Sequence, residues 1–450
     1  MPDALISVYD KSGLDDLASG LVELGWRLFA SAGTCRFLSE RGIESASTDG
    51  LTGFESLLEG RVKTLHPVLH AGILARGDER ERMKREGQPV FDMVVVDFYP
   101  FTYARERFEA TDRELVELID IGGPAMGRAA AKNWEHVLVV PGPSCYGDVL
   151  RAARDGALDA DLRRRMASRL YGITALYDLE VSVKLEEGLE EGLRYGENPH
   201  QKAWLHRTWP PLGIGLAELV HGSSMSYNNY LDADAAMSLA ADMPAGSCAA
   251  VIIKHGNPCG AALGDSPLDA FEKAFAADTV SPYGGILALN AEVDLGLVER
   301  LKGLFLELLI APGFEEEALQ RLRKRKKLRV LRSDLRPKAQ LELRSVEGGI
   351  LLQTPDATAP EVSSADAVTS RKPSGAEMAA LDLAWRVCRG VRSNAIVVAA
   401  PDRILGIGAG QMSRIESLGL ACARAEAAGL SVAGGVLASD GFFPFRDGVD

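Results

Sequence analysis

The sequence predicts an α/β protein of two domains, the first an open, mostly parallel sheet with helices on both faces. Over roughly the first 150 residues, apolar runs of strand length alternate with stretches of helical period. The chain has 450 residues, of which 46% are hydrophobic and 25% charged, as in ordinary globular proteins. At roughly 100–200 residues per domain, this length favours more than one domain.

The elements of the first domain follow from these patterns. Residues 93–96 and 137–140 are continuous apolar runs, as in strands that are buried on both faces. The expected strands are residues 4–9, 27–31, 93–96 and 137–140, and the expected helices are 14–24, 35–41, 112–120, 124–133 and 161–189. Residues 188–192 read as a hinge, so the predicted domains are 1–190 and 191–450.

The second domain is predicted to be α/β as well. Its expected strands are residues 249–254, 285–289, 349–352, 395–399, 404–407 and 433–439, with helices at 267–277, 375–389 and 414–428.

Composition excludes several classes of protein. The net charge of −13 argues against a general nucleic-acid binder, and the basic run 321–329 (RLRKRKKLR) reads as a solvated helix end. No apolar stretch is long enough to span a bilayer, and residues 1–10 lack the pattern of a signal peptide. Six scattered cysteines without a CxxC pair are typical of reduced thiols in a cytoplasmic protein, and they give no metal cluster.

Several turns of the first domain have the composition of an anion cradle. The segments Ser7–Lys11 and Ser31–Thr34 each follow a strand and open a helix, where backbone N–H groups can bind phosphate. Taken singly, each is more often a plain helix cap, and neither is a P-loop. The segment 60–64, with Arg61, Lys63 and Thr64, shifts the balance toward a phosphorylated small ligand.

Other polar residues are suited to proton transfer and charge stabilisation. Tyr99 follows a buried strand, and Asp120 stands beside Gly122 and Gly123, whose N–H groups can face a ligand. In the second domain Lys254 and His255 follow an apolar strand and precede Asn257, so His255 could act as a general base beside an ammonium.

A further constellation lies near the end of the chain. Asn394 precedes a strand, and Gln411 follows a glycine-rich turn that could read an anion or an amide. One phenylalanine of the cluster 442–445 could stack on a flat heterocycle, although core packing explains most of that cluster.

These residues lie in motifs that resemble one family from end to end of the chain. The motifs are GRVKTLHP (60–67), IDIGGP (119–124), RAAAKN (128–133), RYGENPHQ (194–201), KHGNPCG (254–260), SNAIV (393–397), GIGAGQMSR (406–414) and SDGFFPFRDGVD (439–450). They are similar to those of the bifunctional purine biosynthesis family, which joins an AICAR formyltransferase to an IMP cyclohydrolase. The resemblance implies a methylglyoxal-synthase-like first domain, two cytidine-deaminase-like subdomains in the second, and a homodimer.

The resemblance also implies roles for individual residues. In formyl transfer from 10-formyltetrahydrofolate to AICAR, His255 would take a proton, Lys254 would stabilise the oxyanion, and Asn394 would hold the formyl oxygen or the amine. In ring closure of formyl-AICAR to IMP, the protons would be managed by Lys63, Tyr99, Asp120 and Lys132. Substrate binding would fall to Ser7, Lys11, Ser31, Gly33, Thr34, Arg61, Thr64, Gly122, Gly123, Arg194, Tyr195, Asn257, Gln411, Phe442 and Asp447.

The resemblance implies no catalytic metal, although the family can carry a structural potassium ion, and no nucleic-acid or membrane partner. Two departures stand out. Members of the family usually continue beyond FPFRDGVD, which leaves as an alternative a cyclohydrolase whose second half is only a dimerisation scaffold. Outside enzymes, the alternative is a nucleotide-binding regulatory protein on the same α/β frame. Asp97 stands where many relatives have Asn, which adds a negative charge near a phosphate ligand.

Overall fold

The computed structural model describes residues 1–53, 64–99, 101, 112–186, 192–208, 210–244, 246–334, 341–356 and 362–448. The chain divides into two compact units, Met1–Leu189 and Glu190–Asp450, and both are α/β. In the described parts of the chain, no helix combines the length and the apolar character that a membrane span needs.

The first unit is a five-stranded sheet in which every neighbouring pair of strands is parallel, as predicted. Its strands, in spatial order, are β3 (Ala46–Ser47), β2 (Arg27–Ala30), β1 (Asp3–Ser7), β4 (Met93–Val96) and β5 (Leu138–Pro141). The central strands β1 and β4 are almost fully buried, which explains their continuous apolar sequence.

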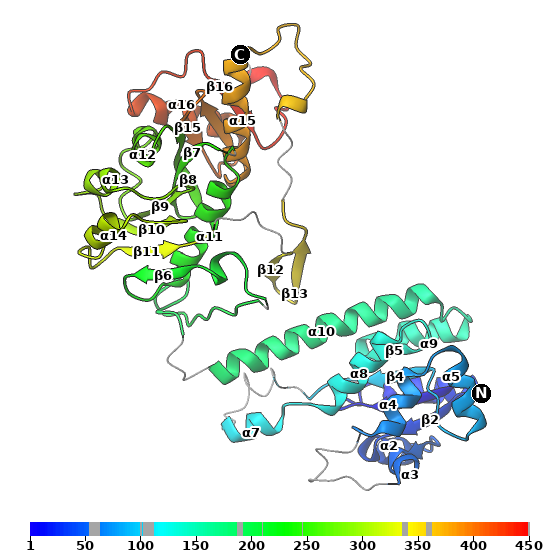
Figure 1. The fold of residues 1–450 in the computed structure, drawn as a ribbon. Coiled ribbons are helices and arrows are strands. Elements are labelled where there is room, and N and C mark those ends of the chain that lie inside the picture. The colour runs from blue at the N-terminus through cyan, green and yellow to red at the C-terminus, as the bar shows by residue number, and fades with distance from the viewer. Residues whose placement is uncertain are drawn as a thin grey trace. The chain divides into compact units, whose positions relative to one another are not determined.

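The helices of this unit connect the strands and cover the sheet (Figure 1). They are α1 (Leu14–Glu23), α2 (Ala32–Ser39), α3 (Thr48–Thr52), α4 (Pro67–Leu74), α5 (Gly77–Arg85), α7 (Asp112–Glu117), α8 (Gly122–Lys132), α9 (Tyr146–Arg154) and α10 (Ala160–Glu186). The helix predicted at 35–41 instead begins at Ala32, because Ser31 takes the extended conformation of a helix N-cap.

The second unit contains a six-stranded mixed sheet in the order β6 (Glu218–His221), β11 (Arg329–Arg332), β10 (Leu306–Ala311), β9 (Gly285–Leu289), β7 (Cys248–Lys254) and β8 (Asn257–Gly264). Alternate residues of β7 face opposite cores. Val251 and Ile253 belong to a cluster with α11 (Tyr227–Ala241) and α15 (Gly375–Arg389), and Ile252 belongs to a cluster with α12 (Pro267–Ala276), α13 (Leu295–Arg300) and α14 (Glu316–Leu322). The sheet is therefore covered by helices on both faces (Figure 1).

A three-stranded antiparallel sheet adjoins the first one. It has the order β15 (Ile404–Gly408), β14 (Ile396–Ala399) and β16 (Val436–Ser439), with α16 (Arg414–Ala427) packed on β15. An isolated bridge joins Ala262 of β8 to Arg403, the residue that precedes β15. A separate hairpin consists of β12 (Glu342–Val346) and β13 (Gly349–Gln353). The division into two cytidine-deaminase-like subdomains stays a prediction.

Two sequence interpretations of this unit need correction. The stretch NPCGAALG (257–264) was not among the expected strands, yet it forms β8. Its glycines let α12 approach closely: a Cβ on Gly260 would lie 2.1 Å from the carbonyl oxygen of Ala274. The basic run 321–329 is not simply a helix end. Helix α14 ends at Leu322, and Arg329 is a buried residue that opens β11.

The close packing of α16 on β15 gives a test of this fold. A Cβ on Gly408 would lie 1.8 Å from the carbonyl oxygen of Ser417, so Gly408→Ala is expected to lower the free energy of unfolding by about 2–3 kcal/mol. Gly419→Ala is the matched control, because that helical glycine has nothing within 4 Å and gains about 0.5–1 kcal/mol. Thermal unfolding of the full chain measures both, and equal midpoints for the two variants would contradict the packing.

Candidate active sites

The first candidate site lies where β1 and β4 end. The strand order reverses direction at β1, and open α/β sheets bind ligands at such a switch point, beyond the carboxyl ends of the strands. Ser7 and Val96 are paired across the two strands. The segments 7–11 and 97–99, which are far apart in the sequence, therefore lie at the same edge of the sheet.

Asp97, the first residue after β4, reaches with its carboxylate the turn that follows β1. Its carboxylate accepts the backbone N–H groups of Tyr9 and Asp10, the second at 2.8 Å. Burial raises the pKa of Asp97 to about 6, although the two N–H groups and the nearby Lys11 act in the opposite direction. The turn after β1, which the sequence predicts to bind phosphate, therefore already donates two of its N–H groups to the Asp97 carboxylate.

The turn after β2 contacts the same region. The Ser31 hydroxyl donates to Thr34 Oγ1 at 3.3 Å, and the Thr34 hydroxyl donates to the Val8 carbonyl at 3.4 Å. The Lys11 ammonium also donates to the Val8 carbonyl. The structure therefore brings together five predicted phosphate-binding residues: Ser7, Lys11, Ser31, Gly33 and Thr34.

Asp120 lies at the start of α8, at the same sheet edge. It accepts the N–H of Gly123 at 2.9 Å and the N–H of Tyr99 at 3.4 Å. The loop is fixed from α10, where the buried Tyr177 hydroxyl accepts the N–H of Asp120 at 2.7 Å. Thr64 lies beside Gly122, since a Cβ there would be 2.6 Å from Thr64 Oγ1.

One described residue predicted for this site, Lys132, lies away from its glycines. Lys132 is exposed in the last turn of α8, ten residues after Gly122, which corresponds to about 15 Å along the helix axis. Arg61 and Lys63 lie outside the described residues.

The second candidate site is built on the turn between β7 and β8. His255 and Gly256 form this turn with φ angles of 51° and 70°, and two positive φ values are characteristic of a type I′ hairpin. Before the turn, the Lys254 ammonium donates to the carbonyls of Tyr283 at 3.1 Å and Gly284 at 2.8 Å. The hairpin thus presents an exposed His255 beside an anchored Lys254.

Two polar side chains hold this turn in place. Asp232, on α11, accepts the N–H of Gly256 at 2.7 Å. Burial raises the pKa of Asp232, while the N–H groups of the turn and the charges of His255 and Lys254 oppose that rise. On the other side, Asn257 Oδ1 accepts the N–H of Arg392 at 3.0 Å, and Asn257 Nδ2 donates to the His255 carbonyl at 3.3 Å.

Arg392 connects the hairpin to the segment before β14. The carbonyl of Arg392 accepts the N–H of Gly410 at 2.9 Å. Asn394 Nδ2 donates to the Gln411 carbonyl at 2.9 Å, and Arg414 Nη2 donates to Asn394 Oδ1 at 3.0 Å. The structure therefore brings Lys254, His255, Asn257, Asn394 and Gln411 to one region.

Arg194 and Tyr195 are linked to this region by a contact of Tyr195 with the start of α11. The Arg194 guanidinium lies 5.5 Å from the centre of the Tyr195 ring, and the Tyr195 carbonyl accepts the N–H of Tyr227, the first residue of α11, at 3.5 Å. Asp232 follows five residues later, about 7.5 Å along the helix. Phe442 is 83% exposed after β16, and the side chain of Asp447 lies outside the described part of the structure.

Sequence reasoning missed several residues that shape the two sites. Arg392 could have been found, because it adjoins the motif residue Ser393, and Arg414 lies within the motif 406–414 although no role was assigned to it. Asp232 and Tyr177 carry no such signal, since each lies within an otherwise ordinary helix far from the motifs in sequence.

Comparison with known proteins identifies close relatives. A family model described as "AICARFT/IMPCHase bienzyme" matches residues 130–424, and one described as "MGS-like domain" matches residues 13–125. Proteins named "Bifunctional purine biosynthesis protein PurH" align with 99% of this chain. The Aquifex aeolicus protein is 42% identical over 91% of its own length, and the Chloroflexus aurantiacus protein is 45% identical over 90%. The solved structure titled "Crystal structure of ForH" is 35% identical with a TM-score of 0.37, and it covers 41% of this chain and 97% of its own.

The buried carboxylate of Asp97 makes stability depend on pH. Its pKa of about 6 lies above the ordinary value of 3.8, so the folded state holds the proton more tightly, and stability falls as pH rises from about 4 to about 6. Asp97→Asn should therefore match the wild type near pH 4 and exceed it by about 1–3 kcal/mol near pH 7.5. Urea unfolding at both pH values checks this, and a difference between the two proteins that stays constant with pH would refute it.

Proposed function

This chain belongs to the family of AICARFT/IMPCHase bienzymes, and from that premise we propose how its two units divide the work. It is a bifunctional enzyme of purine biosynthesis that catalyses the last two steps of IMP synthesis, formyl transfer to AICAR and ring closure of the product. Formyl transfer implies a folate-type co-substrate, which we propose to be 10-formyltetrahydrofolate. We assign ring closure to the first unit and formyl transfer to the second.

In the first unit, the edge formed by β1, β2 and β4 would bind formyl-AICAR. The proposal rests on the meeting of Ser31 and Thr34 with the turn after β1, which offers hydroxyl groups and helix N–H groups to a phosphate. Because the Asp97 carboxylate already accepts two N–H groups of that turn, the 5′-phosphate would bind beside them, toward Ser31 and Thr34.

Ring closure joins the carboxamide nitrogen to the formyl carbon and then releases the former formyl oxygen as water. One proton must leave the carboxamide nitrogen and a second must leave the formamide nitrogen, and the oxygen must gain two protons to depart as water. Asp120 is suited to accept the first, because N–H groups of Gly123 and Tyr99 hold its carboxylate at the start of α8. Tyr99 is suited to donate to the oxygen. Lys63 and Lys132 remain predicted participants.

In the second unit, the amine of AICAR would attack the formyl carbon while His255 removes its proton. The oxygen of the tetrahedral intermediate then carries negative charge. Lys254 can stabilise it, because an ammonium has three N–H groups and Tyr283 and Gly284 accept only two of them. Breakage of the bond to the folate nitrogen, with its protonation, completes the transfer. Asn394 and Gln411 would orient the substrates.

A homodimer and a cytoplasmic location are further parts of this proposal. The first rests on the resemblance of the sequence motifs, and the second on the scattered cysteines without a CxxC pair. The alternatives of a scaffold without transferase activity and of a regulatory protein are disfavoured, because bifunctional relatives match 99% of this chain, its second unit included.

His255 tests the transferase assignment. His255→Ala should lower formyl transfer about 100-fold or more and leave the conversion of formyl-AICAR to IMP unchanged, since only the first reaction needs this base. His255→Gly controls for folding, because glycine accepts the φ of 51° without strain and should keep or raise stability by up to about 1 kcal/mol. The assay follows IMP from AICAR plus 10-formyltetrahydrofolate and, separately, from formyl-AICAR. Equal loss of both reactions in either variant would refute the two-site assignment.

Asp120→Asn provides the reciprocal test. It should slow ring closure about 100–1,000-fold, because the amide retains the shape but not the basicity of the carboxylate. Formyl transfer, followed as release of tetrahydrofolate, should be unaffected. Unchanged ring closure would remove Asp120 from the mechanism.

A further inference from the structure

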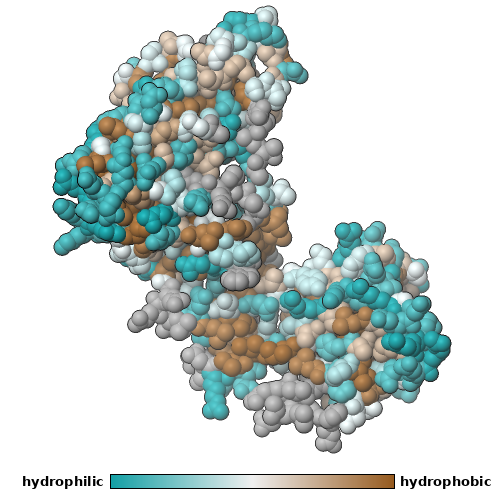
Figure 2. All heavy atoms as spheres, viewed as in Figure 1, coloured by the Kyte–Doolittle hydropathy of each residue, from teal (hydrophilic) through white to brown (hydrophobic). Residues whose placement is uncertain are grey.

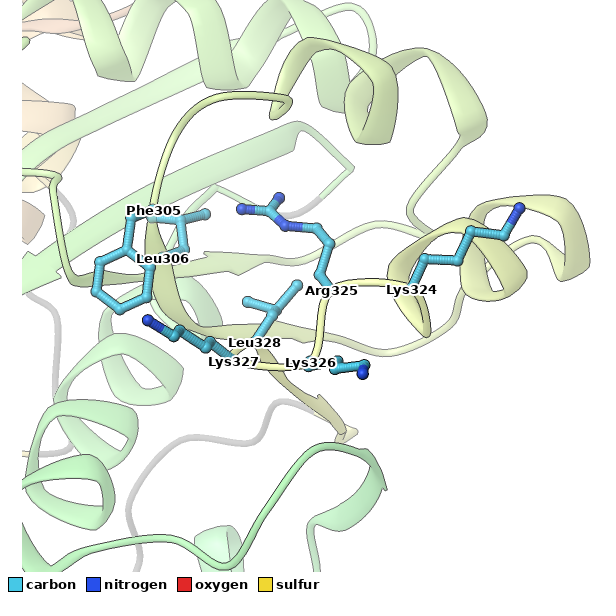
Figure 3. A pocket seen from close by; sticks show the side chains of 7 residues that line it. All are labelled: Phe305, Leu306, Lys324, Arg325, Lys326, Lys327 and Leu328. Carbon is cyan, nitrogen blue, oxygen red and sulfur yellow. The ribbon is translucent and has the colours of Figure 1, made fainter.

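A basic hollow lies on the same edge of the six-stranded sheet as Lys254. It has a volume of about 370 Å³ and is lined by Phe305, Leu306, Lys324, Arg325, Lys326, Lys327 and Leu328 (Figure 3). Phe305 directly precedes β10, and Leu328 directly precedes β11. Lys254 reaches the start of the neighbouring strand β9, where its ammonium binds the carbonyl of Gly284. Neighbouring strands lie about 4.8 Å apart, so the hollow begins about 5–10 Å from that point.

An exposed apolar surface joins the two places. Tyr283 is 67% exposed and Val280 is 80% exposed, next to the carbonyls that hold Lys254. The Tyr283 ring lies 5.3 Å from the Phe305 ring, and the N–H of Gly284 donates to the Phe305 carbonyl at 2.7 Å. A ligand with an aromatic group could lie across Tyr283 and Phe305 and enter the hollow.

The cations of the hollow fall into two groups. Arg325 has a structural role, because its guanidinium donates to the carbonyls of Leu301 and Leu304. Lys324, Lys326 and Lys327 are exposed, and in the described part of the chain no hydrogen bond or ion pair engages their ammonium groups. Figure 3 shows Lys327 extending toward Phe305, while Lys324 and Lys326 extend away from it. Three exposed lysines within four residues make this surface locally positive on a protein of net charge −13, and such a surface attracts polyanions.

We propose that Lys324, Lys326 and Lys327 bind the polycarboxylate tail of the folate co-substrate, whose aromatic part lies over Tyr283 and Phe305. The inference rests on the proposed transferase function. Folates carry an aminobenzoyl group followed by a chain of glutamates, and each added glutamate adds one carboxylate. A formyl group held at Lys254 would direct this tail along the starts of β9, β10 and β11 toward the lysines.

The test compares folates with one and with five glutamates. The variant Lys324→Ala/Lys326→Ala/Lys327→Ala should raise the KM for the five-glutamate donor about tenfold at low salt, with little change for the one-glutamate donor, in kcat or in the KM for AICAR. The control Arg82→Ala/Lys84→Ala/Arg85→Ala removes the same charge from α5 in the first unit and should change none of these values.

Titration calorimetry of the wild-type chain with each of the two folates distinguishes failure of this proposal from failure of the proposed transferase function. Tighter binding of the five-glutamate form that weakens with salt and is lost in the lysine variant supports the proposal. Equal binding of both folates to the wild type overturns it while the transferase function stands. Binding of neither overturns both. A variant that loses affinity for single-stranded RNA but keeps the preference for the longer tail would assign the lysines to nucleic acid and also overturn the proposal.

Discussion

The constraint on which both sites depend is that strand ends leave backbone groups that the sheet does not pair. In the first unit, β2 lies on one side of β1 and β4 on the other. The N–H groups in the turns after these strands have no strand partner, so they need other hydrogen-bond acceptors. Asp97 and Asp120 supply two of these partners from within the protein. The same edge can therefore hold a negatively charged substrate and place carboxylates beside it.

The second unit meets the constraint with an antiparallel hairpin. A turn with two positive φ angles exposes His255 at its tip, and its N–H groups are satisfied from outside the hairpin by Asp232. Asn257 then ties the turn to Arg392, before β14. The polar residues around the turn therefore come from α11, both strands of the hairpin and the three-stranded sheet. Figure 2 shows that hydrophilic side chains gather over the region of α13 and α14, in the same unit as the basic hollow.

Sequence periodicity predicted those helices and strands whose own buried faces require apolar residues at regular positions. Met93–Val96, Gly285–Leu289 and Gly375–Arg389 were placed at their observed bounds, because apolar runs and capping residues mark them directly. Strand β8 was missed, because its glycines reflect the approach of α12 rather than its own conformation. Lys132 shows the limit for site residues: its motif marked it as a candidate, yet its place at the far end of α8 lies about 15 Å along the helix from Gly122.

The most direct measurement of the central claim is the number of nucleotides that one chain binds. Two separate sites for a ribose monophosphate predict that AICAR and IMP occupy one chain together, with two bound nucleotides per chain in equilibrium dialysis at saturating concentrations. A total of one, with AICAR and IMP competing for it, would contradict the assignment of two sites.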